Sequence, residues 1–414
     1  MNSFESALDW LYGTQQFGIK PGLELMFRLA RALELKTAHA AARDAHHNPA
    51  APAYIHVAGT NGKGSTCAFI AAICREAGLR TGLYTSPHLI GFRERIQING
   101  IQISENDALD GLCKIRAITQ DWQPHPTFFE ITTALAIHWF EKKHVDVVVL
   151  ETGMGGRLDA TNIVHPLVSV ITPIAFDHEQ YLGSTLDKIA FEKAGIIKRS
   201  APVVSAPQDP IAATVLNNQA SEFGTTISYA NLPYDGPLGL KGVVQNWNAA
   251  LAIKAIKASG LPINDALMRE GLLKAEWPGR FQIVSDNLIL DGAHNPNAAR
   301  ALAENWRSVF GEEKACLIFG CMADKDVEGV LRNLNPITAS IQLCPVQSPR
   351  AVSVSELQKL CSKWMPGIPV RSHDSLKAAL GAQTQHRRLL TGSLFLVGEA
   401  LGIVQGTLRE ASLQ

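Results

Sequence analysis

The chain has 414 residues, which is long for a single hydrophobic core and favours two domains. Its 38 basic and 38 acidic side chains balance, so the overall charge gives no reason to expect nucleic acid or an anionic membrane as a partner. No apolar run reaches the length of a membrane span, no secretory signal is visible, and seven scattered cysteines without a Cys-x-x-Cys pair predict reduced thiols. The composition argues against strongly basic, secreted and membrane-spanning classes and predicts a cytoplasmic protein.

The first fifty residues are predicted to be helical, because apolar side chains recur there close to the helical period. The residues that carry this pattern are Leu23, Met26, Phe27, Ala30 and Leu33. Pro-Gly and Asn-Pro pairs interrupt the segment, and a strand is expected directly after Pro52. We therefore expect a helical segment that leads into the first domain and is not a domain of its own.

A buried strand, a glycine-rich turn and the start of an apolar helix follow one another over residues 54–66. Three glycines allow backbone N–H groups to converge on a phosphate, Lys63 supplies a cation, and Ser65 or Thr66 supplies a hydroxyl suited to Mg²⁺. Gly64 stands where the usual P-loop has Ser or Thr directly after the lysine, so the ordinary motif does not match. The pattern predicts a phosphate cradle, and a purely structural turn is the alternative.

A second strand, expected at residues 78–85, completes a βαβ unit and so predicts a parallel sheet. In such a sheet, functional groups gather at the carboxyl ends of the strands. Residues 86–100 follow at such an end and hold Ser86, a histidine, two arginines and a glutamate. This loop either binds a ligand or is a solvated connection, and its composition does not decide between the two.

The segment 127–130 precedes an apolar helix expected at residues 131–140. Thr127 with Glu130 three residues later matches a capping box, which is a structural role. The functional alternative is that Phe128 or Phe129 stacks on an aromatic substrate. Both interpretations stay open.

Two apolar strands lead to acidic residues. Residues 145–150 form a nearly continuous β-branched run, typical of a buried parallel strand, and lead to Glu151 in a glycine-rich segment. A carboxylate at that position suits a Mg²⁺ ion beside the phosphate turn, and an N-cap role is the alternative. Residues 167–172 lead to Asp177 and His178, and His178 is either a ligand of a second metal ion or a structural histidine.

Lys193 lies on a helix that is predicted to begin at Thr185. Its neighbours Phe191, Ala194 and Ile196 are apolar. Partial burial of the amine is therefore expected, and a buried lysine pairs with an acid, shifts its pKa or is modified. A salt-bridged lysine, or one whose amine reaches the surface, is the structural alternative.

A second α/β domain is predicted in the last part of the chain. A Trp-Pro-Gly interruption at residues 277–279 precedes it, and we place the linker at about residues 279–286. Residues 201–240 are expected to form short strands that finish the first domain. Strands of the second domain are predicted at residues 287–290, 315–319, 340–344 and 389–391. The predicted fold is α/β, with a large P-loop-type parallel-sheet ATPase domain at residues 1–281 and a smaller Rossmann-like domain at residues 287–414.

Together these motifs resemble the bacterial folylpolyglutamate synthase and dihydrofolate synthase family, within the ATP-dependent Mur ligase superfamily. The resemblance covers nearly the whole chain and rests on segments at residues 59–65, 86–89, 151–162, 177–178, 192–195, 245–249, 277–282, 291–296 and 320–326. It implies ATP-dependent ligation of L-glutamate to dihydropteroate, which forms dihydrofolate, and/or to the γ-carboxylate of tetrahydrofolates, through an acyl phosphate. It also implies two Mg²⁺ ions as cofactors, and we expect a monomer.

The resemblance further implies roles for individual residues. It assigns Ser65 and Glu151 to one Mg²⁺ ion and His178 and Lys193 to a second, with Lys193 carbamylated on its amine. It implies catalytic roles for Lys63, His178, Lys193 and His294. The implied nucleotide contacts are Asn61, Gly62, Lys63, Gly64, Ser65, Asn248, Arg280 and Asp291. The implied contacts of the pterin-bearing substrate are Ser86, Thr127, Phe128, Phe129, Glu130, Leu158, Asp159 and Ala160.

Leu25 departs from the family pattern, which usually has an arginine at this position.

Three other functions fit less well. Cell-wall Mur ligases carry a further domain before the phosphate turn, whereas fewer than sixty residues precede Gly59 here. A P-loop ATPase or kinase would not explain the late motifs that hold Asn248, Arg280 and Asp291. A regulatory ATP-binding module without turnover would be expected to lack Glu151, His178 or Lys193, and all three are present. Another amino-acid ligase of the superfamily, acting on a non-folate carboxylate, remains the alternative.

Overall fold

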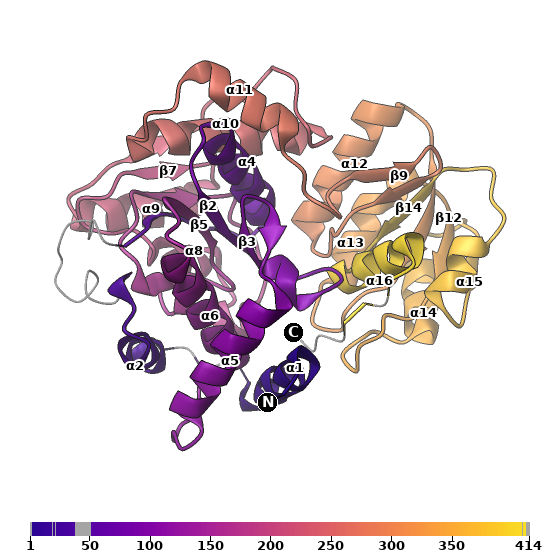
Figure 1. Ribbon diagram of the computed structural model, residues 1–414. Coiled ribbons are helices and arrows are strands. Elements are labelled where there is room, and N and C mark those ends of the chain that lie inside the picture. The colour runs from indigo at the N-terminus through magenta and orange to yellow at the C-terminus, as the bar shows by residue number, and fades with distance from the viewer. Residues whose placement is uncertain (1, 19, 21, 38–50, 408, 411–414) are drawn as a thin grey trace.

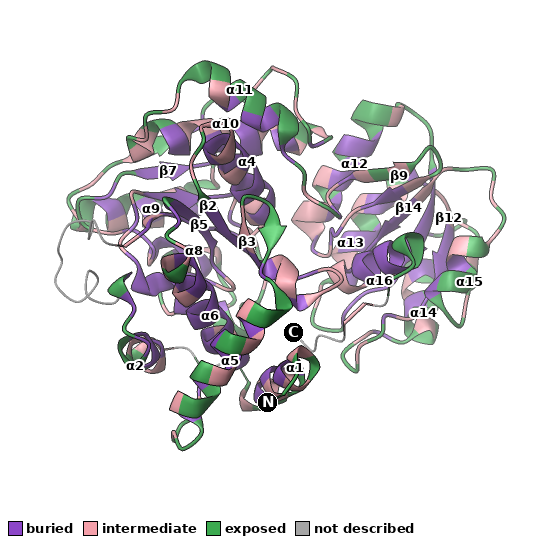
Figure 2. Cartoon of the chain, in the orientation of Figure 1, coloured by how far each residue is buried: buried purple, intermediate pink, exposed green. Residues whose placement is uncertain are grey.

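The structure is a computed structural model that describes the chain apart from residues 1, 19, 21, 38–50, 408 and 411–414 (Figure 1). Two β-sheets lie side by side, each covered by helices, and confirm the predicted α/β class. Figure 2 shows the buried residues along the strands and along the sides of the helices that face them. No helix within the described ranges is both long and apolar enough to cross a membrane.

The first sheet contains β1 (Ala53–Ala58), β2 (Thr81–Tyr84), β3 (Ile96–Ile98), β4 (Ile101–Gln102), β5 (Val147–Glu151), β6 (Val168–Ile171), β7 (Val203–Ser205) and β8 (Ile227–Tyr229). These eight strands are ordered β4-β3-β2-β5-β1-β6-β7-β8. β3 runs antiparallel to both of its neighbours, and the other pairs are parallel. The strands predicted at residues 78–85, 145–150 and 167–172 are confirmed as β2, β5 and β6.

Helices cover both faces of this sheet because strand side chains alternate between the faces. Ile55 and Val57 of β1 face α4 (Lys63–Glu76), α10 (Val243–Ser259) and α11 (Asp265–Lys274). The opposite face is covered by α5 (Glu105–Thr119), α6 (Phe128–Lys142), α8 (Leu186–Ala194) and α9 (Pro210–Glu222). The described part of the first domain also contains α1 (Phe4–Gly13), α2 (Glu24–Ala32), the short α7 (Glu179–Leu182) and the 3₁₀ turn η3 (Ala160–Ile163).

The N-terminal helices α1 and α2 pack against α5 and α6 and confirm the predicted helical segment in part. The portion of that prediction at residues 38–50 lies outside the described residues. Further 3₁₀ turns are η1 (Thr14–Phe17), η2 (Phe92–Arg95) and η4 (Asn335–Ile337). Six cysteines have buried, free thiols, as the sequence predicted: Cys67, Cys74, Cys316, Cys321, Cys344 and Cys361.

The second sheet contains β9 (Gln282–Ser285), β10 (Leu288–Leu290), β11 (Ala315–Phe319), β12 (Thr338–Leu343), β13 (Val370–Ser372) and β14 (Arg388–Thr391). Its order is β13-β12-β11-β14-β10-β9, with only the β9–β10 pair antiparallel. One face is covered by α12 (Pro296–Phe310), α13 (Val327–Leu334) and α14 (Val354–Trp364). The other face is covered by α15 (Leu376–Gly381) and α16 (Leu394–Gln405).

Three elements differ from what the sequence led us to expect. Residues 201–240 contain α9 between β7 and β8, and not short strands alone. The buried stripe of α9 consists only of Ala212, Leu216 and Ala220, so its apolar period is weak. β9 lies inside the range assigned to the linker, and its side chains alternate between half-buried and exposed, as in an edge strand. β13 was not predicted, because it is a three-residue edge strand with little apolar content.

Candidate active site

The carboxyl ends of three adjacent strands bring the predicted site residues together. β1 lies between β5 and β6 in the first sheet, and Val57 of β1 pairs in register with Glu151 of β5. The glycine turn follows β1, and Asp177 and His178 follow β6. The phosphate turn, the acid and the histidine that the sequence singled out therefore share one edge of the sheet.

The glycine turn has the shape of a phosphate cradle. Gly62 has a φ of +88°, and a Cβ on it would lie 2.5 Å from Asn248 Oδ1. A Cβ on Gly59 would collide with Thr172, so neither position accepts a side chain without rearrangement. Gly62 is the N-cap of α4 and provides no side-chain cap, which leaves the first N–H groups of the helix for an anion.

Two lysine amines meet the backbone of this turn. Lys63 Nζ donates to the carbonyl oxygens of Gly59 and Thr60, both at 3.2 Å. Lys193 Nζ donates to the same Gly59 oxygen at 2.8 Å, and its side chain is only 3% exposed. Burial lowers the pKa of Lys193 to about 7, and the positive charge of Lys63 acts in the same direction. No carboxylate in the described part of the chain lies within 4.0 Å of this amine, so the salt-bridge alternative for Lys193 is wrong.

Glu151 is buried at the end of β5 and its Oε2 accepts the backbone N–H of Ser86 at 3.0 Å. Burial raises the pKa of this carboxyl, while the charge of Lys63 opposes the rise. Ser65, in the first turn of α4, is also buried. A carboxylate and a hydroxyl are hard oxygen ligands, so their chemistry fits Mg²⁺. No group of three or more His, Cys, Asp or Glu side chains among the described residues suits a metal ion, so a Mg²⁺ ion here would also need phosphate or water ligands.

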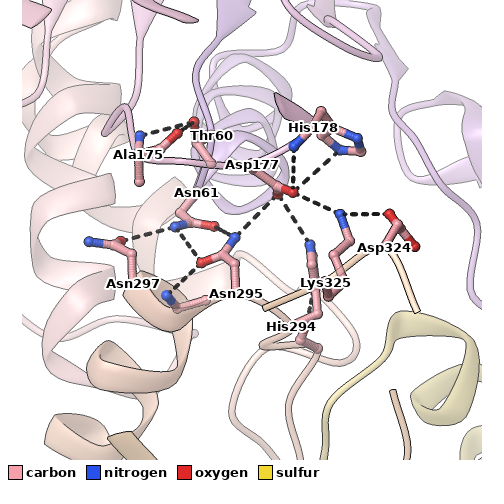
Figure 3. Close-up of polar contacts among 12 residues, drawn as sticks. Thr60, Asn61, Ala175, Asp177, His178, His294, Asn295, Asn297, Asp324 and Lys325 are labelled. Atoms are coloured by element: carbon pink, nitrogen blue, oxygen red, sulfur yellow. Dashed lines mark hydrogen bonds and ion pairs between the residues drawn. The ribbon is translucent and has the colours of Figure 1, made fainter. Parts of the chain in front are cut away.

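Asp177 is the centre of a polar network that joins the two sheets (Figure 3). Lys325 Nζ lies 2.7 Å from its Oδ1, and His294 Nε2 lies 3.5 Å from its Oδ2. Burial alone would raise the pKa of Asp177, but the hydrogen bond and charge of His294, with the charges of His178 and Lys325, hold it well below its usual range. The side chains of Asp177 and Lys325 are each only 10% exposed, so this ion pair is sheltered from water.

Three asparagines extend the network to the glycine turn (Figure 3). Asn61 Nδ2 donates to Asn295 Oδ1 at 3.2 Å and to Asn297 Oδ1 at 2.9 Å. Asn295 Nδ2 donates to Asn61 Oδ1 at 3.0 Å and to Asp177 Oδ2 at 3.3 Å. Sequence reasoning gave no role to Asp177, Asn297 or Lys325, although motif segments contain the first and the last. Lys325 could have been found from the sequence, because it follows an apolar strand and so lies beyond the carboxyl end of β11.

The residues predicted to contact nucleotide lie along the junction of the domains. Asn248 packs on Gly62 and donates from Nδ2 to Gln245 Oε1 at 3.0 Å. Asp291 accepts the backbone N–H groups of Phe281 and Ala293, both at 2.8 Å, and so fixes the chain on both sides of β9 and β10. Burial raises the pKa of Asp291, opposed first by the charge of Arg280.

The segment predicted to hold the pterin-bearing substrate starts with a capping box, as expected. Glu130 Oε2 accepts both the N–H and the hydroxyl of Thr127, each at 2.8 Å, while Thr127 Oγ1 accepts the N–H of Glu130. Phe128 is buried and stacks on Tyr12 with ring centroids 5.7 Å apart. Phe129 is half-buried and is therefore the more accessible of the two aromatic candidates.

Asp159 is a buried acid near this segment, flanked by the half-buried Leu158 and the buried Ala160. Its carboxylate accepts the N–H of Met154 at 2.9 Å and the hydroxyl of Thr161 at 2.5 Å. Burial raises its pKa, and these hydrogen bonds oppose the rise. The acid is thus held in one orientation by its own loop.

Asp177→Asn is expected to lower the free energy of unfolding at pH 7 by about 3 kcal/mol, because the buried charge of Lys325 would lose its nearer and more buried partner and keep only Asp324. Because the folded-state pKa of Asp177 is depressed, its contribution is present above the unfolded pKa of about 3.9 and fades as pH falls below that value. Denaturant titrations at pH 7 and pH 3.5 measure both effects.

Asp324→Asn is the matched control for this prediction, because Asp324 Oδ2 also lies 3.5 Å from Lys325 Nζ but its side chain is 34% exposed. Its expected cost is below about 1 kcal/mol. Equal costs for the two substitutions would show that Asp177 has no special role in holding the domains together.

Family comparisons agree with this arrangement. Residues 57–233 match the Mur ligase middle domain, and residues 279–394 match the Mur ligase, glutamate ligase domain. The dihydrofolate synthase/folylpolyglutamate synthase of Bacillus subtilis is 35% identical, with 96% of this chain and 98% of that protein covered. The Escherichia coli protein of the same name is also 35% identical, with 86% and 87% covered.

Solved structures show the same likeness in the fold. Escherichia coli FolC in complex with DHPP and ADP aligns with a TM-score of 0.87 at 31% identity, over 98% of each chain. The bifunctional folylpolyglutamate synthase/dihydrofolate synthase of Yersinia pestis, complexed with AMPPNP and Mn ion, aligns with a TM-score of 0.85 at 32% identity, over 98% of each chain. The chain therefore belongs to the dihydrofolate synthase/folylpolyglutamate synthase family of the Mur ligases, as its motifs predicted.

Proposed function

We propose that this chain joins L-glutamate to folate precursors and folates at the expense of ATP. One reaction forms dihydrofolate from dihydropteroate, and the other extends tetrahydrofolates at the γ-carboxylate. The observation that carries the proposal is the junction of the two domains, where Asp177 of the first domain contacts His294 and Lys325 of the second, and Asn61 of the phosphate cradle contacts Asn295 and Asn297. The printed activities of the relatives give the same reaction.

The chemistry explains why such a site is needed. A carboxylate is a poor electrophile, so its oxygen first attacks the γ-phosphorus of ATP, ADP leaves, and an acyl phosphate forms. The amine of glutamate then attacks the acyl carbon, the amide bond forms, and inorganic phosphate leaves with the original carboxylate oxygen. Lys63 and the N–H groups at the start of α4 neutralise charge on the transferred phosphoryl group. The domain junction excludes water that would hydrolyse the acyl phosphate.

The same proposal includes two Mg²⁺ sites, one with Ser65 and Glu151 and one with His178 and Lys193. Bound Mg²⁺ would neutralise charge between the phosphates of ATP and the acceptor carboxylate. The low pKa of Lys193 supports a carbamate, because the neutral amine adds to CO₂ with loss of one proton and gives a carboxylate. This change would turn a buried cation beside Gly59 into a metal-binding anion.

The remaining assignments stay proposals. Nucleotide would contact the turn residues with Asn248, Arg280 and Asp291, and the acceptor would contact Ser86, residues 127–130 and residues 158–160. His294, already turned toward Asp177 at the junction, would approach the phosphates. The domain limits of 1–281 and 287–414, a monomeric state and a cytoplasmic location belong to the same proposal, the last supported by the six buried free thiols.

Glutamate-dependent release of ADP tests this function. Separate reactions contain ATP, Mg²⁺ and glutamate with either dihydropteroate or tetrahydrofolate, and controls omit glutamate or the acceptor. We expect release with each acceptor only when glutamate is present. Release with neither acceptor would overturn the folate assignment and favour a ligase that acts on another carboxylate.

A further inference from the structure

The last described residues of the chain return from the second domain to the first. α16 packs on the second sheet, and the chain beyond it reaches the loop before η2 and the helix α1 (Figure 1). We call Arg409 and Glu410 the strap.

The strap binds the backbone of one short loop in the first domain. Arg409 Nε donates to the carbonyl oxygen of Leu89 at 2.9 Å. The backbone N–H of Glu410 donates to the carbonyl oxygen of Ile90 at 2.8 Å, and its Oε2 accepts the N–H of Phe92 at 2.7 Å. The strap therefore forms hydrogen bonds with two backbone carbonyl groups and one backbone N–H group of the loop.

The loop is held from the other side as well. The carboxylate of Glu94 accepts the three N–H groups of residues 89–91 at distances of 2.7, 2.8 and 2.7 Å. Each N–H group from residue 89 to Phe92 thus points at a carboxylate oxygen, three at Glu94 and the last at Glu410. Hydrogen bonds to carboxylates are among the stronger ones, so removal of Glu410 releases one end of an otherwise fixed loop.

The strap also reaches the aromatic residues at the start of α6. The hydroxyl of Tyr12 donates to Glu410 Oε2 at 3.3 Å. Burial and the charge of Glu410 raise the pKa of Tyr12, so its hydroxyl remains a donor at neutral pH. The Tyr12 ring lies parallel to Phe128, with an interplanar angle of 10°.

The strap contacts the loop before η2 and Tyr12, and each of these is next to residues of the proposed acceptor surface. The loop begins at Ser86, whose N–H binds Glu151, and η2 ends at Arg95, whose guanidinium lies 5.2 Å from the centre of the Phe128 ring. Tyr12 contacts the same ring through its stack on Phe128. Loss of the strap would therefore disturb residues 86–95 and Phe128 while leaving the phosphate turn intact.

We propose that Glu410 is a positioning residue for the acceptor, which fixes the loop at residues 86–95 and the Tyr12–Phe128 stack in the geometry that binds it. This inference rests on the proposed function, because the acceptor surface belongs to that proposal. It makes acceptor binding depend on the placement of the second domain, since the strap is the continuation of α16. The strap contributes no atom to the reaction.

Glu410→Ala is expected to raise the KM for dihydropteroate about tenfold, the effect of losing one charge-assisted hydrogen bond, while the KM for ATP changes less than about twofold. Tyr12→Phe, which keeps the ring stack, should raise the KM for dihydropteroate about threefold. The KM for dihydropteroate of the double variant, Glu410→Ala with Tyr12→Phe, should equal that of Glu410→Ala within about twofold, because both substitutions remove the same contact. Titration calorimetry with dihydropteroate gives a second readout that does not require turnover.

Glu313→Ala is the matched control, because Glu313 pairs only with Arg387 at 3.1 Å among the described ion pairs and belongs to the segment between α12 and β11 of the second domain. It should leave both KM values unchanged. If Glu410→Ala fails to fold, Glu410→Gln keeps an acceptor oxygen and should shift the KM for dihydropteroate in the same direction by a smaller factor. An unchanged affinity for dihydropteroate in a folded Glu410 variant, or equal shifts for ATP and acceptor, would overturn the inference. A wild-type protein that neither turns over nor binds dihydropteroate would instead overturn the proposed function.

Discussion

Lys63→Ala should lower kcat by about 10³-fold, which corresponds to about 4 kcal/mol of lost transition-state stabilisation. Lys63 is the first residue of α4, and its amine lies over the turn between the carbonyl oxygens of Gly59 and Thr60. Phosphoryl transfer depends mainly on positioning and charge neutralisation, so removing this cation affects the transition state more than the fold. Glutamate-dependent ADP release measures kcat, and thermal unfolding followed by circular dichroism checks the fold.

A surface lysine provides the control for this experiment. Lys274, whose side chain is 54% exposed, pairs with Glu76 at 2.6 Å on the helices that cover the first sheet. Lys274→Ala should leave kcat within about twofold of the wild type, because exposed ion pairs contribute little. A folded Lys63→Ala protein with normal turnover would remove Lys63 from the mechanism.

Lys193→Ala should lower kcat by about 10²-fold to 10³-fold, and acetate or formate should restore part of it. The reason is that a carbamate on Lys193 is a carboxylate, and a small carboxylic acid fits the space left by the side chain. The burial of Lys193 and its pKa of about 7 favour this modification over an ordinary structural lysine. The measurement is kcat as a function of acetate concentration at constant ionic strength.

Lys198→Ala is the control for the rescue, because burial also lowers the pKa of Lys198, to about 8, yet its amine contacts only Asn162 among the described hydrogen bonds. Acetate should not change the turnover of this variant. If Lys193→Ala loses activity only in proportion to its loss of fold, and acetate restores none, Lys193 is an ordinary buried lysine.

Local rules were enough to predict much of the fold. A capping box requires only two residues three apart, and Thr127 with Glu130 forms one. The β-branched run before Glu151 is typical of a central parallel strand, and β5 lies in the middle of the first sheet. The carboxyl ends of parallel strands meet at one edge, so Glu151 and Asp177 could be placed near the glycine turn from sequence alone.

Contacts that depend on how two domains pack were not predictable in this way. Lys325 meets Asp177 across 148 residues of sequence, and Tyr12 meets Glu410 across 398. No local period or motif spacing reports such pairs, because they follow from the arrangement of the two sheets. Short edge strands such as β13 were also not predicted, because three residues are too few to show an alternation of apolar and polar side chains.

One departure from the family pattern is without explanation. Leu25 lies half-buried in the first turn of α2, where the sequence resemblance led us to expect an arginine, and the structure gives no account of the difference.

Transfer of oxygen from the acceptor to phosphate tests the central claim most directly. Dihydropteroate labelled with ¹⁸O in its carboxylate is incubated with ATP, Mg²⁺ and glutamate, and the products are analysed by mass spectrometry. An acyl phosphate predicts one ¹⁸O atom in the inorganic phosphate released in each turnover, with ADP unlabelled. Unlabelled phosphate, or the label in AMP, would contradict activation of the acceptor by the γ-phosphoryl group.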